Sequence, residues 1–257
     1  MLAISIAGVE MRGDIPTRSR MRGLIVKPQG FQGWQGLSST RREALARAVQ
    51  HGEHDVPVYL GSRVVTIDGW AVGESEDEVG NLSDSVTGLF AAGRTLVTVE
   101  HQGKRLDAYA RAVVAECDDY APDEFVSEFQ VQLLFADPRK YGETLTLPGD
   151  KLNPPVSSAT ATSINVFHYG NFPAFPVVVI PDAPAAYSIT AGGKTFTVTG
   201  ATAGGTHEVH LRNGRVYRNG VEMVRVGKGD LWVVPVSTIL THVLSVPGRV
   251  RIVDTFV

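Results

Sequence analysis

Two histidine pairs have the residue types and spacing that could bind a metal ion. His51 and His54 flank Gly52 and Glu53, so two imidazoles and a carboxylate lie close together in the sequence. The order differs from the His-Glu-x-x-His pattern of zinc hydrolases, and Gly52 would break the helix that aims both rings at one point. An exposed helix end, where a histidine interacts favourably with the helix dipole, is therefore the preferred interpretation.

The second pair, His207 and His210, lies in a segment that predicts a β-strand. Side chains three residues apart on a strand point to opposite faces, so these two rings cannot easily bind one ion. A polar strand edge is the preferred interpretation of this pair.

Paired carboxylates are another candidate chemistry, because glycoside hydrolysis needs two of them. The dense acidic groups are Asp118-Asp119 and a cluster at Glu74, Glu76, Asp77 and Glu78. Both groups fall in predicted loops, where runs of charge are usually solvated.

Three tryptophans and one cysteine complete the list of candidates. Trp34, Trp70 and Trp232 could form a platform for sugar rings, but Trp70 and Trp232 lie at predicted strand ends, which favours core packing. Cys117 lies inside a predicted strand and is interpreted as a buried, inert thiol. The sequence has neither a phosphate-binding loop nor a Gly-x-Ser-x-Gly elbow. It therefore predicts no catalytic, cofactor-binding or metal-binding residue, and a protein that is not an enzyme.

Helices and strands alternate in the first part of the chain. Thr40 and Glu43 form a capping box that predicts a helix ending at Gly52. Its apolar stripe would consist of Ala44, Leu45, Ala48 and Val49. A second short helix is predicted from Asn81 toward Phe90, with Gly93 as its end.

Strands are predicted at residues 23–27, 56–60, 63–70, 95–100, 107–117 and 125–135. The spacing of Gly30, Gly33 and Gly36 predicts an irregular loop or a bulged edge. Gly61-Ser62 predicts a tight hairpin between residues 56–60 and 63–70, and Gln102-Gly103 predicts a second turn. In residues 125–135 every second side chain, from Phe125 to Phe135, is expected on one buried face. Pro138 then ends the strand pattern.

From about residue 148 helical patterning stops, and Val, Thr, Gly and Pro become frequent. Short strands are predicted at residues 163–169, 176–180, 186–191, 195–199, 208–211, 215–218, 231–234 and 249–255. Asn213-Gly214 and Asn219-Gly220 are typical of hairpin turns. The pattern predicts a β-sandwich or jelly roll, and hence two domains, residues 1–148 and 149–257.

Composition excludes several classes of protein. The chain is 43% hydrophobic and 20% charged, with a net charge of −3, which argues against a dedicated nucleic-acid binder. One cysteine forms no intrachain disulfide and is compatible with a reducing compartment. We expect no signal peptide and no membrane span, and therefore synthesis and assembly in a cytoplasm. Residues 1–148 carry 15 basic and 21 acidic side chains, whereas residues 149–257 carry 9 and 6.

Several motifs follow one another in a characteristic order. Tyr59-Leu-Gly-Ser-Arg63 precedes Ile67-Asp-Gly-Trp70, and Leu134-Phe-Ala-Asp-Pro-Arg-Lys-Tyr141 ends a strand pair. Gly170-Asn-Phe-Pro-Ala-Phe-Pro-Val-Val-Val-Ile180 then opens the β-rich C-terminal region. In this order, over nearly the whole chain, the sequence resembles the distal tail proteins, or baseplate hubs, of siphophages, particularly those infecting Actinobacteria. The segment of residues 1–22 is longer and more basic than the corresponding segment of that family's pattern, which leaves its role open.

The resemblance implies a mainly β fold with one or two short helices. Residues 1–148 would form an α+β, tail-tube-like domain that assembles into a homohexameric ring, and residues 149–257 a galectin-like β-sandwich. The protein would be a structural virion component of the tail tip without catalytic residues. Its ring would join the major tail tube protein to a tail-associated adhesin, with the tape measure protein or receptor-binding proteins as further candidate neighbours.

Two physical arguments agree with this interpretation. An acidic lining repels phosphates, so DNA would pass the lumen of the ring without specific binding, and the cluster at residues 74–78 is expected to face the channel or its rim. Open β-edges would supply the contacts that close the ring. The alternatives are a carbohydrate-binding module or lectin-like adhesin that uses the C-terminal sandwich, and a hydrolase or peptidase that acts on cell walls.

Overall fold

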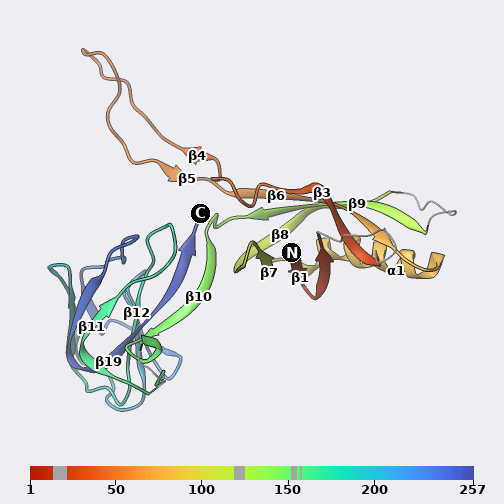
Figure 1. Ribbon diagram of the computed structural model, residues 1–257. Coiled ribbons are helices and arrows are strands. Elements are labelled where there is room, and N and C mark those ends of the chain that lie inside the picture. The colour runs from red at the N-terminus through yellow and green to blue at the C-terminus, as the bar shows by residue number, and fades with distance from the viewer. Residues whose placement is uncertain (14–21, 119–124, 152–154, 157) are drawn as a thin grey trace. The chain divides into compact units, whose positions relative to one another are not determined.

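The computed structural model describes residues 1–13, 22–118, 125–151, 155–156 and 158–257 (Figure 1). The chain divides into two compact units, Met1–Lys140 with Val257, and Tyr141–Phe256. Each unit has its own apolar core, and the expected mainly β fold is confirmed. Among the described residues, no helix is long and apolar enough to cross a bilayer.

Unit 1 is built on seven strands whose hydrogen-bonded pairings run in a closed cycle. In spatial order they are β1 (Ala3–Ile6), β2 (Val9–Arg12), β3 (Gly23–Gln32), β6 (Arg63–Val72), β9 (Val126–Phe135), β8 (Lys104–Cys117) and β7 (Thr95–His101), which pairs again with β1. The pairing is incomplete along some strands, because β7 pairs with Lys104–Ala110 of β8 and β9 pairs with Arg111–Cys117 of it. The expectation that open edges of this domain supply ring contacts therefore stays a prediction.

Alternating burial places the core of unit 1 inside this cycle. On β9 the predicted face is confirmed from Ser127 to Phe135, since every second side chain there is buried and the residues between them are not. It is wrong for Phe125, which precedes the strand and is 40% exposed. Strand β6 alternates in the same way from Arg63 onward. At Gly69 of β6 a Cβ atom would lie 2.3 Å from the Phe129 ring, so glycine allows the two strands to pack around this aromatic side chain.

The first two strands of the cycle were not predicted from the sequence. The expected first strand, at residues 23–27, corresponds to β3, which has a register shift between Val26 and Phe31. Strands β1 and β2 precede it and are joined by Ala7 and Gly8, both with positive φ. The alternation of Ile4 and Ile6 with small residues was the sequence signal for β1.

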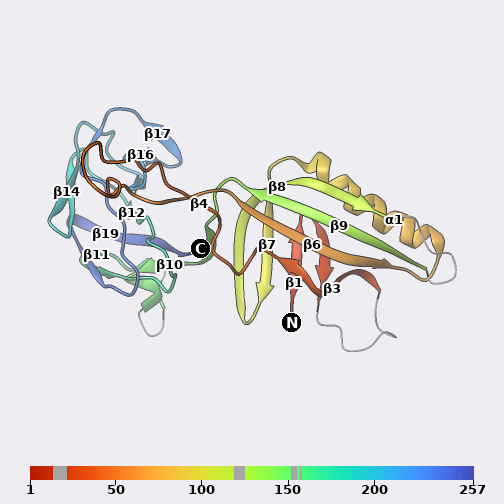
Figure 2. The same cartoon turned by 90° about the horizontal axis from the view of Figure 1, so that it is seen from above.

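The helix of unit 1 begins earlier than its sequence pattern suggested. Helix α1 covers Glu76–Thr87, and a 3-10 helix, η2, continues over Gly88–Ala92 to the predicted end at Gly93. Figure 2 shows α1 alongside β8 and β9, against which it packs. Its buried Val79 and Val86 join the core.

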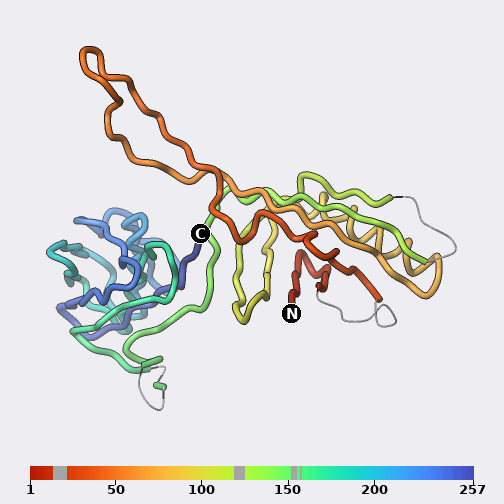
Figure 3. The backbone as a smooth tube through the Cα atoms, turned by 45° about the horizontal axis from the view of Figure 1, so that its top comes forward, coloured from red at the N-terminus to blue at the C-terminus, as the bar shows by residue number. Residues whose placement is uncertain are grey.

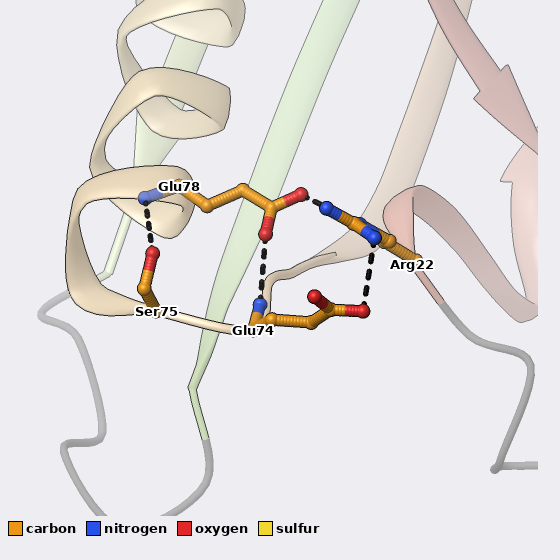
Figure 4. A network of polar contacts seen from close by, with 4 residues as sticks. All are labelled: Arg22, Glu74, Ser75 and Glu78. Carbon is orange, nitrogen blue, oxygen red and sulfur yellow. Dashed lines mark hydrogen bonds and ion pairs between the residues drawn. The ribbon is translucent and has the colours of Figure 1, made fainter.

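The placement of the acidic cluster in a loop is therefore wrong. Ser75 is the N-cap and accepts a hydrogen bond from the Glu78 amide at 3.3 Å, while the Glu78 carboxylate accepts one from the Glu74 amide at 2.9 Å. Arg22 binds both carboxylates, at 2.9 Å to Glu74 and 2.8 Å to Glu78 (Figure 4). Acidic side chains in a first turn stabilise the positive end of the helix dipole, which explains the early start.

The helix predicted from Thr40 to Gly52 is absent. Residues 37–62 form a hairpin arm instead, with strands β4 (Thr40–Arg41) and β5 (Tyr59–Leu60) near its base (Figure 3). Leu45 and Val49, which would have lined the helix, are 69% and 96% exposed. An amphipathic helix of about 12 residues is marginal without a surface to pack on, and the arm has none within the chain.

The tight hairpin predicted around Gly61-Ser62 is also wrong. Strand β5 pairs with β4, whereas β6 pairs along its length with β9 and along most of it with β3. Both edges of β6 are thus occupied, so the segment before Gly61 can only continue into the arm.

Unit 2 is a β-sandwich. One sheet has the order β11 (Ala161–Val166), β19 (Leu240–Phe256), β13 (Tyr187–Ala191), β14 (Lys194–Val198) and β18 (Gly227–Gly229). The other has the order β17 (Val221–Met223), β16 (Arg215–Arg218), β15 (His207–His210), β12 (Val177–Ile180), β19 and β10 (Lys140–Leu147). A short 3-10 helix, η3, covers Gly149–Lys151.

The long strand β19 belongs to both sheets of the sandwich. Residues before Gly248 pair with β11 and β13, and residues after it pair with β12. Pro247 and Gly248 lie at the point where the strand changes sheet, which suits residues that weaken regular pairing. The predicted strand at residues 231–234 is absent, and Val234 makes a single bridge with Ala174.

A neutral histidine is buried between the strands of unit 2. The indole Nε1 of Trp232 donates to Nε2 of His242 at 3.0 Å, so the imidazole proton belongs on Nδ1, which lies 3.1 Å from the carbonyl of Leu240. Burial lowers the pKa of His242 from 6.5 to about 4, against a smaller opposing effect of the Leu240 carbonyl.

Unit 2 should therefore lose stability in acid through His242. Between pH 6.5 and about 4 this histidine is protonated in the unfolded chain but stays neutral in the folded chain. The free energy of unfolding therefore falls as pH falls through this window. The loss should reach about 3 kcal/mol at the acid end. His242→Gln keeps an acceptor for Trp232 but does not titrate, and urea unfolding across this window should show a shallower dependence on pH. Equal slopes for the two proteins would contradict this account.

Candidate functional site

The hairpin arm of unit 1 carries apolar side chains that the chain itself does not cover. None of residues 39–60 is buried. Its strongly exposed apolar residues are Leu37, Leu45, Val49, Val58 and Tyr59. Exposed apolar side chains that are frequent on one projecting segment make that segment a candidate interaction surface. The arm is therefore the main candidate for an assembly contact.

Local hydrogen bonds hold the arm as a hairpin. The His54 amide donates to the carbonyl of Leu45 at 2.9 Å, and the Arg47 amide donates to that of Gly52 at 3.2 Å. Gly52 has φ near +90°, the left-handed conformation that its predicted role as a helix end also required. His51 and His54 lie in this exposed tip, so the helix end expected for them is absent.

The arm is anchored at its root by Arg63, the first residue of β6, which is 2% exposed. Its Nη1 donates to the carbonyls of Gly33, Trp34 and Gly36 at 2.7, 3.0 and 2.6 Å, and its Nε donates to that of Pro138 at 3.1 Å. One guanidinium thus joins the chain before the arm to the chain after β9. We call this arrangement the Arg63 anchor.

A second buried cation supports the same loop. Nζ of Lys140 donates to the carbonyl of Trp34 at 2.8 Å and lies 5.4 Å from the centre of its ring. No ion pair of the described residues includes either cation. Burial lowers the pKa of Arg63, and burial followed by the charge of Arg63 lowers the pKa of Lys140 to about 8. Carbonyl dipoles therefore stabilise both charges.

A second exposed surface lies on the outer face of β8. Tyr109, Arg111 and Val113 point outward from β8, where Tyr109 is paired with Leu96 of β7. Arg111 is paired with Leu134, which is paired in turn with Val64 of β6. Paired residues on adjacent strands share a face, so these side chains form one surface. We call it the β8 patch, consisting of Val64, Leu96, Tyr109, Arg111, Val113 and Leu134.

The composition of the β8 patch is typical of protein interfaces. Four of its apolar side chains are exposed, those of Val64, Leu96, Tyr109 and Val113. The guanidinium of Arg94 lies 4.1 Å from the centre of the Tyr109 ring. Tyrosine and arginine are enriched at the centres of protein–protein interfaces.

The remaining candidate residues do not come together. In the described part of the chain, no group of three or more His, Cys, Asp or Glu residues could hold a metal ion. His207 is buried and contacts the Tyr187 hydroxyl and the Thr202 carbonyl, whereas the ring of His210 lies near Tyr217. The two rings therefore lie on opposite faces of β15, as the spacing predicted. The polar strand edge expected for this pair is wrong, because β15 lies between β12 and β16 and His207 is buried. Asp119 lies outside the described residues.

The tryptophans and the cysteine have largely structural environments. Trp34 and Trp232 are buried, and half-buried Trp70 donates to the Glu128 carboxylate at 3.2 Å. Cys117 lies in β8 as expected but is half-buried, with Sγ 3.7 Å from the Ser83 carbonyl. Burial raises the pKa of this thiol, which lowers its reactivity.

Sequence reasoning missed both the Arg63 anchor and the β8 patch. One signal was available, because Arg63 occupies an inward position in the alternation that continues through Val65 and Ile67. A charged residue in such a position must find buried partners, but the sequence does not show which ones.

Comparison with solved structures identifies proteins of the same fold. The chain matches the SPP1 Dit (gp 19.1) protein, described as a paradigm of the hub adsorption apparatus of phages infecting Gram-positive bacteria, with a TM-score of 0.72 and 15% identity over 100% of both chains. It also matches a chain of the phage P2 baseplate in its activated, Ca-containing conformation, with a TM-score of 0.51 and 8% identity over 99% of this chain and 98% of the other. No protein-family model and no curated protein sequence matches. The fold expected from the sequence resemblance is thereby confirmed over the whole chain.

The Arg63 anchor should contribute strongly to the stability of unit 1. Arg63→Ala removes the donor from four carbonyls at once, and we expect a loss of about 3 kcal/mol or more in the free energy of unfolding. Arg105→Ala is the matched control, because Arg105 is exposed and makes a surface ion pair with Glu100 that is worth little. Urea unfolding of the full chain measures the stability of both variants. Similar unfolding midpoints for Arg63→Ala and Arg105→Ala would show that the Arg63 anchor does not stabilise unit 1.

Proposed function

We propose that this chain is a structural virion protein, the distal tail hub of a long-tailed phage, whose ring links the tail tube to the tail-tip adhesin or receptor-binding apparatus. The hairpin arm carries the proposal, because it exposes apolar side chains that no other described part of the chain covers. The full-length likeness to SPP1 Dit supports the same role. The chain would act by assembly and not by catalysis.

A closed ring needs two different surfaces on each copy, because every copy contacts one neighbour on each side. The strands of unit 1 pair in a closed cycle and leave only parts of strands unpaired, so we look for the surfaces among exposed side chains. We assign the arm as one surface and the β8 patch of the next copy as the other. Six copies, as in the family that the sequence resembles, would complete the ring.

The two units would divide the work. Unit 1 carries both proposed surfaces, so ring closure should depend on residues 1–148, and unit 2 should be dispensable for it. The acidic surplus of the first part of the chain suits a lumen through which DNA passes without being bound. Two of the cluster's side chains, Glu76 and Asp77, carry no ion pair among the described residues and would face the channel or its rim.

Removing the apolar character of the arm should abolish the ring without unfolding the protein. Leu45→Asp combined with Val49→Asp places charges at exposed positions, which costs little in the free monomer but prevents burial against a neighbour. Sedimentation velocity over a concentration series should show rings for the wild type and monomers for the variant. Val221→Asp, an exposed apolar position in unit 2, is the control. A wild type that stays monomeric at every concentration, and gives no rings by electron microscopy, would contradict the proposal.

Mixing two defective variants tests the assignment of the β8 patch. A patch variant, Leu96→Asp with Tyr109→Ala, should be monomeric alone, like the arm variant. In an equimolar mixture, the intact arm of the patch variant can bind the intact β8 patch of the arm variant. The surfaces left over are the two defective ones, so the mixture should give heterodimers and no rings. A mixture that remains monomeric, while the wild type forms rings, would show that the arm binds a different surface.

A further inference from the structure

We propose that unit 2 carries a binding site for an anionic saccharide, with the exposed ring of Tyr169 as its platform and the ammonium of Lys151 as its charged group. The site is a cavity of about 380 Å³ in the segments that follow β11 and precede β19. Its lining residues are Phe167, His168, Tyr169, Gly170, Ser237, Thr238 and Ile239. This inference goes beyond the hub role and concerns unit 2 alone.

Tyr169 presents an aromatic surface that the core does not use. The residue is 64% exposed, and the ring of Phe167 meets its ring edge-on with centres 5.5 Å apart. A sugar ring offers apolar C–H faces together with hydroxyls, which suits the apolar body and polar tip of tyrosine. None of the tryptophans considered from the sequence offers such an exposed platform, since Trp34 and Trp232 are buried.

Buried groups hold this platform in place. The Tyr169 amide donates to the carboxylate of Asp254 at 2.7 Å, and Asp254 is itself buried. The next amide, of Gly170, donates to Nδ1 of buried His168 at 3.1 Å. Gly170 packs so closely against Thr255 that a Cβ atom would lie 2.0 Å from its carbonyl oxygen. A backbone fixed on both sides of an exposed ring is the preorganisation that a binding site needs.

Lys151 supplies a positive charge beside the rings. Its Nζ lies 4.6 and 5.1 Å from the ring centres of Phe167 and Tyr169, and it donates to the Tyr169 hydroxyl at 3.1 Å. No carboxylate of the described residues forms an ion pair with it. The ammonium is thus positioned by neutral groups and retains its charge for a ligand. A carboxylate or phosphate group on a bound sugar would supply the missing negative partner.

The dimensions of the cavity favour a saccharide over a protein partner. Its volume lies in the range of small-molecule sites, whereas a stable protein contact buries about 800 Å² on each partner. The opposite wall provides hydroxyls from Ser237 and Thr238 and one exposed apolar side chain, that of Ile239. Hydroxyls beside an aromatic ring match the alternating polar and apolar groups of a sugar.

The site is tested with the full chain on an array of neutral, uronic-acid-bearing and phosphate-bearing oligosaccharides. Isothermal titration then measures affinity for the strongest ligand of the array. We expect the acidic sugars to bind, and their binding to weaken as salt is raised. Tyr169→Ala should lower the affinity by roughly tenfold or more, and Tyr169→Phe should retain most of it, because the ring remains.

Lys151→Gln separates the roles of charge and ring. It should lower the affinity for acidic sugars by roughly tenfold while leaving weak binding of their neutral analogues unchanged. Lys228→Gln is the matched control, because Lys228 is an exposed lysine of the same unit on β18.

Three outcomes would overturn the proposal. The first is that Tyr169→Ala leaves sugar binding unaffected, and the second is that neutral sugars bind more tightly than acidic ones. The third is that no sugar binds, while the Tyr169 variant loses a protein partner from purified tails. Because the measurement needs no ring, a failed ring and a failed sugar site give separate results.

Discussion

Closure of the seven-stranded barrel is the constraint on which the rest of unit 1 depends. Once β7 pairs with β1, every strand of the cycle is paired with two others, although some of these pairings cover only part of a strand. Such a domain offers a neighbouring chain only short unpaired stretches, whereas an open sheet offers a whole edge strand. Exposed side chains, or a segment that leaves the barrel, offer larger surfaces for self-association. The hairpin arm is such a segment.

An arm that leaves the barrel needs a rigid root, and the Arg63 anchor provides one. Buried cations are usually paired with carboxylates, but here the guanidinium and the Lys140 ammonium are held by backbone carbonyls. Carbonyls accept hydrogen bonds from Nε and Nη1 of Arg63 and from Nζ of Lys140 without adding a second ion whose burial would also cost free energy, while Nη2 of Arg63 is buried without a partner among the described residues. Backbone groups and an indole also bind the buried side chains of His168 and His242 in unit 2, where no carboxylate of the described residues pairs with either ring. In both units, buried polar groups fix the position of chain segments that are themselves exposed.

The sequence predicted the elements whose signals are local. Strands β7, β8 and β9, the turn at Gln102-Gly103 and most strands of the sandwich follow from alternation and turn residues, and the structure has them. The candidate site was harder to predict from the sequence. Its parts come from β6, β7, β8 and β9 and from the loop around Trp34, and no single segment shows that they meet.

By itself, the sequence determined the mainly β class, the character of each face of β9 and a resemblance that proved right for the fold of the whole chain. Tertiary structure alone decided the fate of residues 40–52, where a capping box and an apolar stripe favoured a helix. Short-range preferences contribute little free energy, and a helix forms from them only when its apolar face finds a surface. Because β6 is enclosed by β3 and β9, the preceding chain has no such surface and extends as an arm.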